Sequence, residues 1–239
     1  MKGVIFDNDG VLVNSEETAV LHDPPFLLQF GIQYSSAEYA AIMSGKTGAD
    51  FLKKLNADCI ARTGLPLPSE FSDKLKQNYR HQVANLLRDI EGSGDLVRSL
   101  KAMGIPVAVA SNGEHETMRR KLEKVGLYET FLPHVYNKDD VGGIPKPAPD
   151  LFLFAMRKLG ISNPAECIVL EDSPTGIQAA KAAGMYTIGF SGGLHRQPDY
   201  TAVLKASGAD VVVDTMKEAG KIIHAFFAPP RPAFNTNQP

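Results

Sequence analysis

Two carboxylates placed two positions apart, Asp7 and Asp9, are the residues of this sequence best suited to chemistry. They follow the apolar run Val4–Phe6 directly and precede Gly10. In an extended chain, side chains two residues apart point to the same side, and glycine permits a turn that a residue with a Cβ would resist. Buried charges are costly unless a cation, hydrogen bonds or water offset them. The pair therefore predicts a site where a nucleophile and a proton donor face one substrate.

Three further groups of polar residues could contribute to the same site. Two of them follow apolar runs, as the aspartate pair does, and one lies in a loop of glycines and prolines. They are Ser111-Asn112 after residues 106–110, Glu171-Asp172 after residues 167–170, and Lys146 within residues 142–147. In an open parallel sheet, ligands bind outside the carboxyl ends of the strands. We therefore expect the two groups that follow apolar runs to meet the aspartate pair at one edge of a sheet, with the loop that holds Lys146 as a fourth element.

The residue types fit the transfer of a phosphoryl group. A carboxylate approaching a phosphate meets repulsion of about 4 kcal/mol per pair of unit charges ~4 Å apart at an effective dielectric of ~20. A lysine and a magnesium ion would offset it. Magnesium prefers carboxylate and carbonyl oxygens plus water, which Asp7, Asp172 and the main chain of Asp9 offer. Ser111 and the Asn112 amides offer neutral donors to phosphate oxygens, and Asp9 could protonate a leaving oxygen and later activate water.

The sequence elements that must position these residues show two different patterns of hydrophobic residues. From about residue 92 onward, short apolar runs alternate with amphipathic helical patterns, which is typical of a parallel sheet covered by helices on both faces. The expected strands are residues 4–6, 106–110, 167–170, 186–190 and 211–213. The sequence thus predicts an α/β fold with a Rossmann-like parallel sheet.

Residues 15–90 contain no clear strand pattern and predict an inserted, all-helical cap. Ser35-x-x-Glu38 and Thr47-x-x-Asp50 resemble helix starts with capping boxes, and an apolar stripe with helical spacing runs from Phe71 to Ile90. Pro24-Pro25 is expected to break or start a helix. The predicted division is an α/β core of residues 1–14 and 91–227, a helical cap of residues 15–90, and a proline-rich tail of residues 228–239.

Composition limits the possible partners and surroundings. The chain has 239 residues, 44% of them hydrophobic, and a formal net charge of −2. No block of like charge favours nucleic acid, and no run approaches the ~18 apolar residues of a membrane span. Cys59 and Cys167 lie far apart without metal-type spacing, and the segment before Asp7 is too short for a signal-peptide core. We expect a cytoplasmic protein that binds neither nucleic acid nor membrane.

Taken in order, these motifs resemble those of the haloacid dehalogenase-like hydrolase superfamily, in the helical-cap branch that contains phosphatases and beta-phosphoglucomutase. The matching residues are Asp7-x-Asp9-Gly-Val, Ser111-Asn112, Gly-x-Pro-Lys146-Pro-x-Pro-Asp150 and Glu171-Asp172-Ser173. The resemblance extends to about residue 215. The chain departs from the pattern at Asn14, where related sequences often have aspartate, and at residues 91–94, where Pro-Gly is usual.

The resemblance implies that Asp7 is a nucleophile that forms an aspartyl-phosphate and that Asp9 is the general acid and base. It implies phosphate contacts from Ser111, Asn112 and Lys146. It also implies a magnesium ion held by Asp7, the Asp9 carbonyl and Asp172, with Glu171 close by. The dehalogenases themselves lack the second aspartate, so Asp9 argues for phosphate chemistry.

The predicted function is hydrolysis of a small phosphorylated metabolite, with a sugar phosphate as the expected substrate. Two alternatives stay open: a phosphosugar mutase of the beta-phosphoglucomutase type, and a phosphometabolite-binding module without activity. In the cap, Lys46 and His22 are candidate substrate contacts, although Lys46 could equally belong to a simple helix start. Asp7–Gly10 alone could form an Asx-type turn or resemble a calcium loop. Ser111-Asn112 could cap the next helix, and the oligomeric state is left open.

Overall fold

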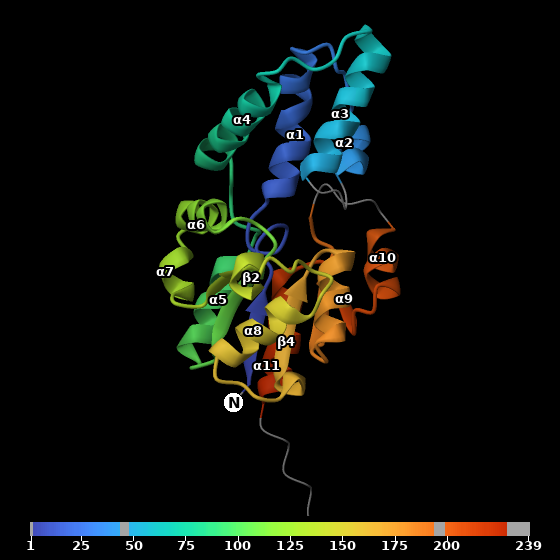
Figure 1. Ribbon diagram of the computed structural model, residues 1–239. Helices are drawn as coiled ribbons and strands as arrows, with labels where there is room; N and C mark the ends of the chain where they lie inside the picture. The colour runs from blue at the N-terminus through green and yellow to red at the C-terminus, as the bar shows by residue number, and fades with distance from the viewer. Residues whose placement is uncertain (1, 44–47, 194–198, 229–239) are drawn as a thin grey trace, which may run out of the picture.

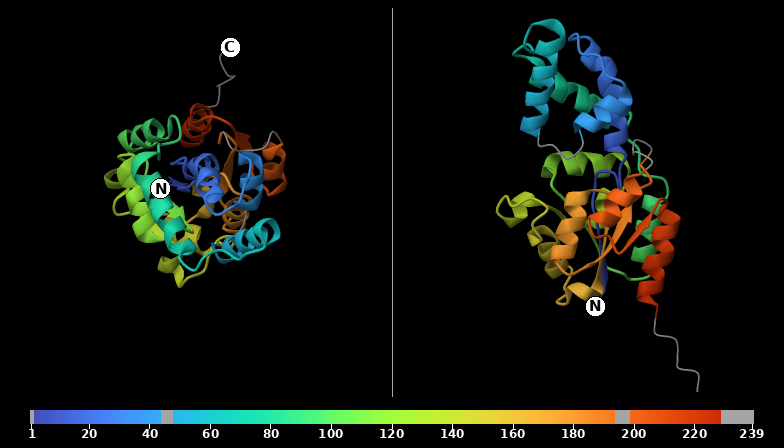
Figure 2. Two further views of the ribbon diagram at one scale, coloured as in Figure 1. Left: turned by 90° about the horizontal axis from the view of Figure 1, so that it is seen from above. Right: turned by 90° about the vertical axis from the view of Figure 1, so that its right-hand side faces the viewer.

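The computed structural model describes residues 2–43, 48–193 and 199–228 of the chain. It consists of a parallel sheet with helices on both faces and of a cap of helices beyond one end of the sheet (Figure 1). Figure 2 shows the cap helices at the end of the sheet where the first strand, Gly3–Phe6, leads into them.

Within the described residues, six strands pair in parallel in the order β3-β2-β1-β4-β5-β6. Their bounds are Gly3–Phe6 (β1), Val107–Ser111 (β2), Val135–Asn137 (β3), Cys167–Glu171 (β4), Tyr186–Phe190 (β5) and Val211–Val213 (β6). The strand order reverses direction between β1 and β4. In doubly wound sheets such a switch point opens the crevice that binds ligands.

Alternate side chains of the strands face two separate apolar layers. The helices of the sheet part are α5 (Ser93–Ala102), α6 (His115–Lys124), α7 (Tyr128–Phe131), α8 (Asp150–Lys158), α9 (Pro174–Ala182), α10 (Tyr200–Ala206) and α11 (Met216–Phe227), with 3-10 turns η1 (Lys138–Val141) and η2 (Pro164–Glu166). Val4 and Phe6 belong to the layer that includes α5, α6 and α11, whereas Ile5 belongs to the layer formed with α8 and α9. Burial on both faces explains why the strands are nearly continuous apolar runs.

The cap has an apolar core of its own. Its helices are α1 (Ser15–Leu28), α2 (Ser36–Met43), α3 (Gly48–Thr63) and α4 (Phe71–Asn85). Leu27, Tyr39 and Leu55 are fully buried within this core. Ser35 caps α2 as its capping box predicts, because the Glu38 amide donates to the Ser35 hydroxyl at 3.2 Å and the Ser35 amide donates to the Glu38 carboxylate at 2.7 Å.

Two chain segments connect the cap to the sheet part and bond to each other. The Asn14 amide donates to the Arg88 carbonyl at 3.0 Å, and the Arg88 amide donates to the Asn14 side-chain oxygen at 2.8 Å. The Ile90 amide donates to the Leu12 carbonyl at 3.0 Å. The departure at Asn14 thus falls in the connection, where its side chain ties the two crossing segments together.

The predicted fold class is confirmed, and the differences are local. The edge strand β3 was not expected, because its three residues carry too short an apolar pattern. Pro24 and Pro25 lie inside α1 rather than at its end, because Val20 and Leu27 on either side pack into the same cap core. The predicted helical stripe is too long: α4 ends at Asn85 and the chain then turns toward the sheet part.

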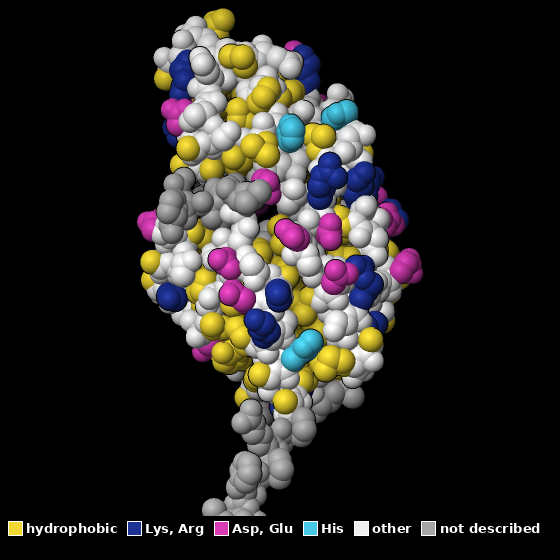
Figure 3. Space-filling model, turned by 180° about the vertical axis from the view of Figure 1, so that it is seen from behind, with side chains coloured by type: hydrophobic (Ala, Val, Ile, Leu, Met, Phe, Trp, Pro, Cys, Tyr) yellow, Lys and Arg dark blue, Asp and Glu magenta, His cyan; other side chains and the backbone are white. Residues whose placement is uncertain are grey.

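On the face seen in Figure 3, acidic and basic side chains are interspersed among hydrophobic and neutral ones. Within the described residues, no helix has both the length and the apolar character needed to cross a membrane.

Candidate active site

Strand β1 and the tight turn after it place the aspartate pair at the switch point of the sheet. The Asp7 amide donates to the Leu170 carbonyl of β4 at 3.0 Å, which continues the pairing of the two strands. The chain then folds back, because the Gly10 amide donates to the Val13 carbonyl at 2.8 Å. Gly10 has φ +77°, the left-handed region that favours glycine. Asp7 is buried and Asp9 is partly exposed.

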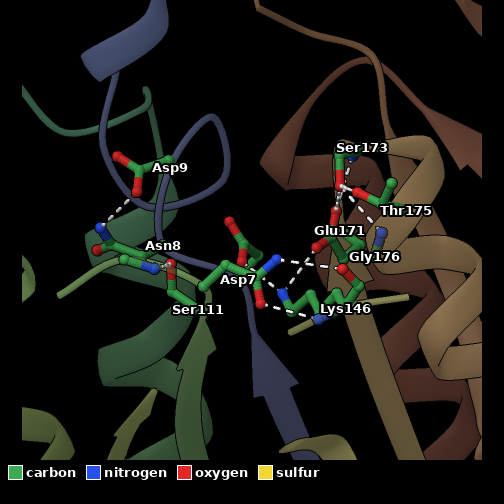
Figure 4. Close-up of polar contacts among 11 residues, drawn as sticks. Asp7, Asn8, Asp9, Ser111, Lys146, Glu171, Ser173, Thr175 and Gly176 are labelled. Carbon is green, nitrogen blue, oxygen red and sulfur yellow. Dashed lines mark hydrogen bonds and ion pairs between the residues drawn. The ribbon is translucent and has the colours of Figure 1, made fainter. Parts of the chain in front are cut away.

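Lys146 lies between two carboxylates from neighbouring strands (Figure 4). Its ammonium donates to Asp7 Oδ1 at 2.6 Å and to Glu171 Oε1 at 2.8 Å, and all three side chains are nearly fully buried. The second oxygen of Glu171 accepts from the Ser173 amide at 2.7 Å and hydroxyl at 2.9 Å. Glu171 is therefore already engaged by the lysine and by the cap of α9.

The side chain of Asn112 fixes the lysine loop to the end of β2. The Lys146 amide donates to Asn112 Oδ1 at 2.9 Å, and Asn112 Nδ2 donates to the Lys146 carbonyl at 3.4 Å. The buried Ser111 hydroxyl accepts from the Gly113 amide at 3.2 Å. Asn112 keeps its main-chain amide and the second N–H of its side chain as donors to a phosphate oxygen, and Ser111 still carries a hydroxyl proton to donate.

Asp9 has partners of its own on the side away from Lys146. The ammonium of Lys121 on α6 and the hydroxyl of Ser15 both donate to Asp9 Oδ1, and Asn8 Nδ2 donates to Oδ2 at 3.3 Å. Lys121 is nearly fully buried, and the Asp9 side chain is 28% exposed. Figure 4 shows Asp9 set apart from the group of Asp7, Lys146 and Glu171.

The surroundings of the two aspartates move their pKa values in opposite directions. Burial raises the pKa of Asp7 to about 7, because the nearby charges of Glu171 and Asp9 partly cancel the stabilising effect of Lys146. Burial also acts to raise the pKa of Asp9, but Lys121 and Ser15 outweigh it and hold that pKa below the usual range. As a nucleophile Asp7 needs a further positive charge, and as an acid Asp9 needs added negative charge nearby.

The carboxyl ends of β1 and β4 offer what a magnesium ion needs. Four carboxylates lie here, those of Asp7, Asp9, Glu171 and Asp172, together with the two ammonium groups of Lys121 and Lys146. Negative charge is therefore in excess. A Cβ at position 10 would overlap the Asp172 carboxylate, so Gly10 lets this side chain approach the turn of the aspartate pair. In the described residues, no three His, Cys, Asp or Glu side chains form a metal-type group. Magnesium, however, commonly uses one or two carboxylates plus waters.

The sequence-predicted residues divide between this site and the cap. The structure brings together Asp7, Lys146 and Glu171, and places Asp9, Ser111, Asn112 and Asp172 around them. Lys46 lies outside the described residues. His22 is exposed on α1 of the cap, and its contact with substrate stays a prediction.

Sequence reasoning missed Lys121 and Ser15, the partners of Asp9. Lys121 follows Met118 by three residues and precedes Leu122, and both of these pack in the core. The helical spacing alone could have placed this lysine at the edge of the buried face of α6. No feature of the sequence points to its partner, which lies 112 residues away.

We expect the substitution Lys121→Met to move the pH dependence of turnover to higher pH. An opposite charge within a few ångströms lowers the pKa of a carboxylate by about 1–3 units. Without this ammonium, the pKa of Asp9 rises, so each limb of the pH–rate profile that reports Asp9 shifts upward by about one unit or more. Initial rates between pH 5 and pH 9 measure the shift. Lys138→Met, which removes an ammonium paired with Asp139, is the control; a Lys121→Met profile that coincides with its profile contradicts the prediction.

Comparison with known proteins agrees with this geometry. A model of the haloacid dehalogenase-like hydrolases matches residues 1–184. A bifunctional riboflavin kinase/FMN phosphatase from Arabidopsis thaliana is 31% identical over 186 residues, 77% of this chain but 47% of its own length. A phosphorylated carbohydrates phosphatase from Thermotoga maritima is 25% identical, covering 89% of this chain and 94% of its own.

A solved structure extends the comparison to three dimensions. The HAD family hydrolase from Deinococcus radiodurans, determined with bound phosphate and sodium, superposes with a TM-score of 0.82. It is 33% identical and covers 96% of this chain and 99% of its own. The protein belongs to the haloacid dehalogenase-like hydrolases, and the prediction that it is an enzyme of this family is confirmed. Phosphatases of this family generally use magnesium.

Proposed function

We propose that this protein is a magnesium-dependent phosphomonoester hydrolase that acts on a small phosphorylated metabolite, of which a sugar phosphate is the expected example. The observation that carries the proposal is the buried contact of Asp7 with Lys146 at 2.6 Å, with Asp9 beside it in a separate environment. Of the two alternatives, a binding module would not need two carboxylates with such different surroundings. Curated relatives that are phosphatases support the same class of reaction.

The proposed reaction consists of two successive displacements at phosphorus. An Asp7 oxygen attacks phosphorus and the bond to the leaving oxygen breaks, while Asp9 donates a proton to that oxygen. Water then attacks the aspartyl-phosphate, Asp9 takes the water proton, and the bond between phosphorus and Asp7 breaks to release phosphate. Lys146 and the Ser111 hydroxyl hold the phosphate oxygens. The approaching phosphate adds negative charge near Asp9, which favours the protonated acid.

Asp7, Asp172 and the main-chain carbonyl of Asp9 would hold the magnesium ion. When bound, the ion supplies positive charge that offsets repulsion between the carboxylates and the phosphate. The oxygens of Glu171 accept hydrogen bonds from Lys146 and Ser173. Its role in the proposal is therefore to orient the lysine, and it does not bind the metal ion directly. The ends of β1 and β4 thus carry both the nucleophile and the proposed metal ligands.

We further propose that residues 15–90 act as a cap domain over a core of residues 1–14 and 91–227. The separate apolar core of α1–α4 supports this division, as do the crossing segments at Asn14 and Arg88. A cap above the strand ends would exclude bulk water during transfer and select substrates by size. Most of the proline-rich tail, residues 228–239, lies outside the described residues.

Phosphate release from an aryl phosphate tests the reaction class. The purified chain is expected to release phosphate in the presence of magnesium and to lose this activity with a chelator. Phosphate release that persists undiminished in Asp7→Asn, or no release by the wild-type chain, would contradict the proposal. Formation of glucose 6-phosphate from β-glucose 1-phosphate and a bisphosphate primer would instead indicate a mutase.

Magnesium is expected to stabilise the metal-free protein through Asp172. At about 100 times its dissociation constant, a ligand of the folded state contributes about 2.7 kcal/mol, which corresponds to roughly 5–10 °C in a chain of this size. Thermal unfolding with and without magnesium measures this shift. Asp172→Asn should remove most of it, whereas Asp139→Asn, at a 60% exposed side chain, should retain it. An equal shift in both variants would exclude Asp172 as a ligand.

A further inference from the structure

The peptide unit that joins Asp172 to Ser173 is held at both of its polar ends by side chains. The Tyr200 hydroxyl donates to the Asp172 carbonyl at 2.8 Å, and the Ser173 amide donates to the Glu171 carboxylate at 2.7 Å (Figure 4). Because a peptide unit is planar, two bonds at its opposite ends fix the direction in which the whole unit faces. The contact from Tyr200 has no part in the reaction proposed above.

Asp172 lies one residue beyond β4, where strand pairing no longer fixes the backbone. The register of β4 with β5 ends at Glu171, opposite Gly189. Asp172 is 3% exposed, and the backbone carbonyl of a buried residue needs a hydrogen-bond donor. Tyr200 supplies this donor from 28 residues further along the chain. The side chain of Tyr200 thus takes over where the sheet stops.

Helix α10, which carries Tyr200 at its first turn, is itself tied to the sheet. The Thr201 hydroxyl donates to the Ser191 hydroxyl, just beyond β5, at 3.3 Å. The Ser191 amide in turn donates to the Val213 carbonyl of β6 at 2.8 Å. Figure 1 shows α10 beside α9, the helix that begins just after Asp172. The hydroxyl that bonds to Asp172 is therefore held by a helix with a fixed position.

These contacts also set the direction of the Asp172 side chain. The backbone of a residue has two soft dihedral angles, φ and ψ. Strand β4 fixes the peptide unit before Asp172, and Tyr200 with Glu171 fixes the unit after it, so neither angle is free. A Cβ on Gly10 would overlap Asp172 Oδ2, so the carboxylate lies directly against the turn of the aspartate pair. A small rotation of the backbone would move this oxygen relative to that turn.

Metal ions differ in how much such a movement matters. Magnesium demands near-ideal octahedral geometry with oxygen ligands at about 2.0–2.1 Å, whereas calcium accepts flexible geometry and distances of about 2.3–2.6 Å. A carboxylate held in one position therefore favours the smaller ion. A carboxylate that can shift by a few tenths of an ångström loses this advantage and still suits the larger one.

We propose that Tyr200 is a positioning residue that holds Asp172 in the narrow geometry that magnesium requires, and that it thereby favours magnesium over calcium. The inference rests on the proposed function, in which Asp172 is a metal ligand, and deepens it. Because the Tyr200 hydroxyl acts through the main chain of Asp172, its effect belongs to metal binding. The chemical step should be unchanged once magnesium is bound.

The test removes the Tyr200 hydroxyl and keeps the ring. Metal-free wild type and Tyr200→Phe are titrated calorimetrically with magnesium chloride and, separately, with calcium chloride, without substrate. Loss of a group that orients a metal ligand typically weakens metal binding by about 10–100-fold. We expect the dissociation constant for magnesium to rise about tenfold in Tyr200→Phe, and that for calcium to rise less than about threefold, because calcium tolerates the looser geometry.

Activity gives a second readout that separates positioning from catalysis. With an aryl phosphate, the magnesium concentration needed for half of the maximal rate should rise about tenfold in Tyr200→Phe. At saturating magnesium, kcat should stay within about twofold of the wild type, because no reacting group has changed. A loss of kcat that saturating magnesium does not restore contradicts the proposed role.

A second variant and a matched control complete the experiment. Tyr200→Leu removes the ring as well as the hydroxyl, so it should lower thermal stability further but change the preference between the two ions by the same factor. Tyr186→Phe removes a hydroxyl from a half-buried ring on β5 that packs against Phe226. It should bind both ions as the wild type does. Tyr200→Phe stays informative if Tyr200→Leu does not fold.

The outcomes separate this inference from the proposed function. Wild-type affinities in Tyr200→Phe, or losses by an equal factor for the two ions, overturn the positioning role and leave Asp172 and the phosphatase proposal standing. Failure of the wild-type chain to bind magnesium overturns instead the metal site of the proposed function, and the role of Tyr200 with it.

Discussion

The substitution Asp7→Asn is expected to lower the rate of phosphate release by about 10⁴-fold or more, as the removal of a nucleophile does in other enzymes. The amide lacks the negative oxygen that attacks phosphorus, and no other side chain takes its position at the end of β1. Asp7 is held by Lys146 at 2.6 Å, and asparagine has nearly the same shape. The loss should therefore appear in kcat while the fold persists.

The stability of Asp7→Asn gives a second readout. Burial raises the pKa of Asp7 to about 7 from an ordinary value of 3.8, so the ionised form is the less favourable one in the folded, metal-free chain. A group with a raised folded-state pKa contributes stability below its unfolded value and loses it as pH rises through the folded value. Relative to the wild type, the neutral variant should become more stable between about pH 4 and pH 8.

Trapping the covalent intermediate distinguishes this role from simple electrostatics. After rapid acid quenching with phosphate-labelled substrate, the wild-type chain should retain label on the protein and Asp7→Asn should retain none. Asp9→Asn should still acquire label, although more slowly, and should release it slowly, because both the acid for the leaving oxygen and the base for water are missing. Label on the Asp7→Asn protein equal to that on the wild type would place the nucleophile elsewhere. Asp139→Asn, at the surface, serves as the control with wild-type labelling.

The predictable part of the site is the part that depends on strand ends. Asp7, Ser111 and Asp172 each follow an apolar run, and parallel strands bring their carboxyl ends to one edge whatever the packing details. The same reasoning identified the sheet, because strands buried on both faces leave a continuous apolar pattern. Lys146 was predictable as a loop residue of the site, and its contacts with both carboxylates follow from the pairing of β1 with β4.

The remaining features depend on packing between helices, which leaves little trace in sequence. The contact of Lys121 with Asp9 is set by the rotation of α6, and a lysine within a charged helix resembles a surface residue. Pro24-Pro25 suggested a helix boundary, yet Asp23 just before them lies within α1 and is buried among donors from α2 and α4.

Lys146→Met is expected to reduce both stability and turnover. Removing one partner from a buried ion pair typically costs about 3–5 kcal/mol, because the remaining charges lose their compensation. Asp7 and Glu171 would both lose the ammonium that now lies within 2.8 Å of each. The loss of a donor to the phosphate should lower kcat by about 10²–10³-fold, as for other preorganised donors of this kind.

The loss of stability in Lys146→Met should depend on pH and on magnesium. Without the ammonium, the pKa of Asp7 rises above its value of about 7 in the wild type. The wild type stops losing stability above that pH while the variant continues, so the deficit in the free energy of unfolding should be larger at pH 8.5 than at pH 6. Magnesium should recover part of the stability by supplying a cation, without recovering turnover, because the ion does not replace the lysine at the phosphate.

Urea unfolding at the two pH values, with and without magnesium, measures these effects, and Lys138→Met is the control. Lys138 pairs with Asp139 at the surface, with 33% of its side chain exposed, so its replacement should change stability by no more than about 0.5 kcal/mol. Wild-type turnover in Lys146→Met would remove the lysine from the phosphate site. A deficit that stays constant from pH 6 to pH 8.5 would show that Asp7 does not carry the uncompensated charge. The expected combination, a pH-dependent deficit that magnesium reduces and a turnover loss that it does not, arises only if one ammonium both neutralises Asp7 and binds the phosphate.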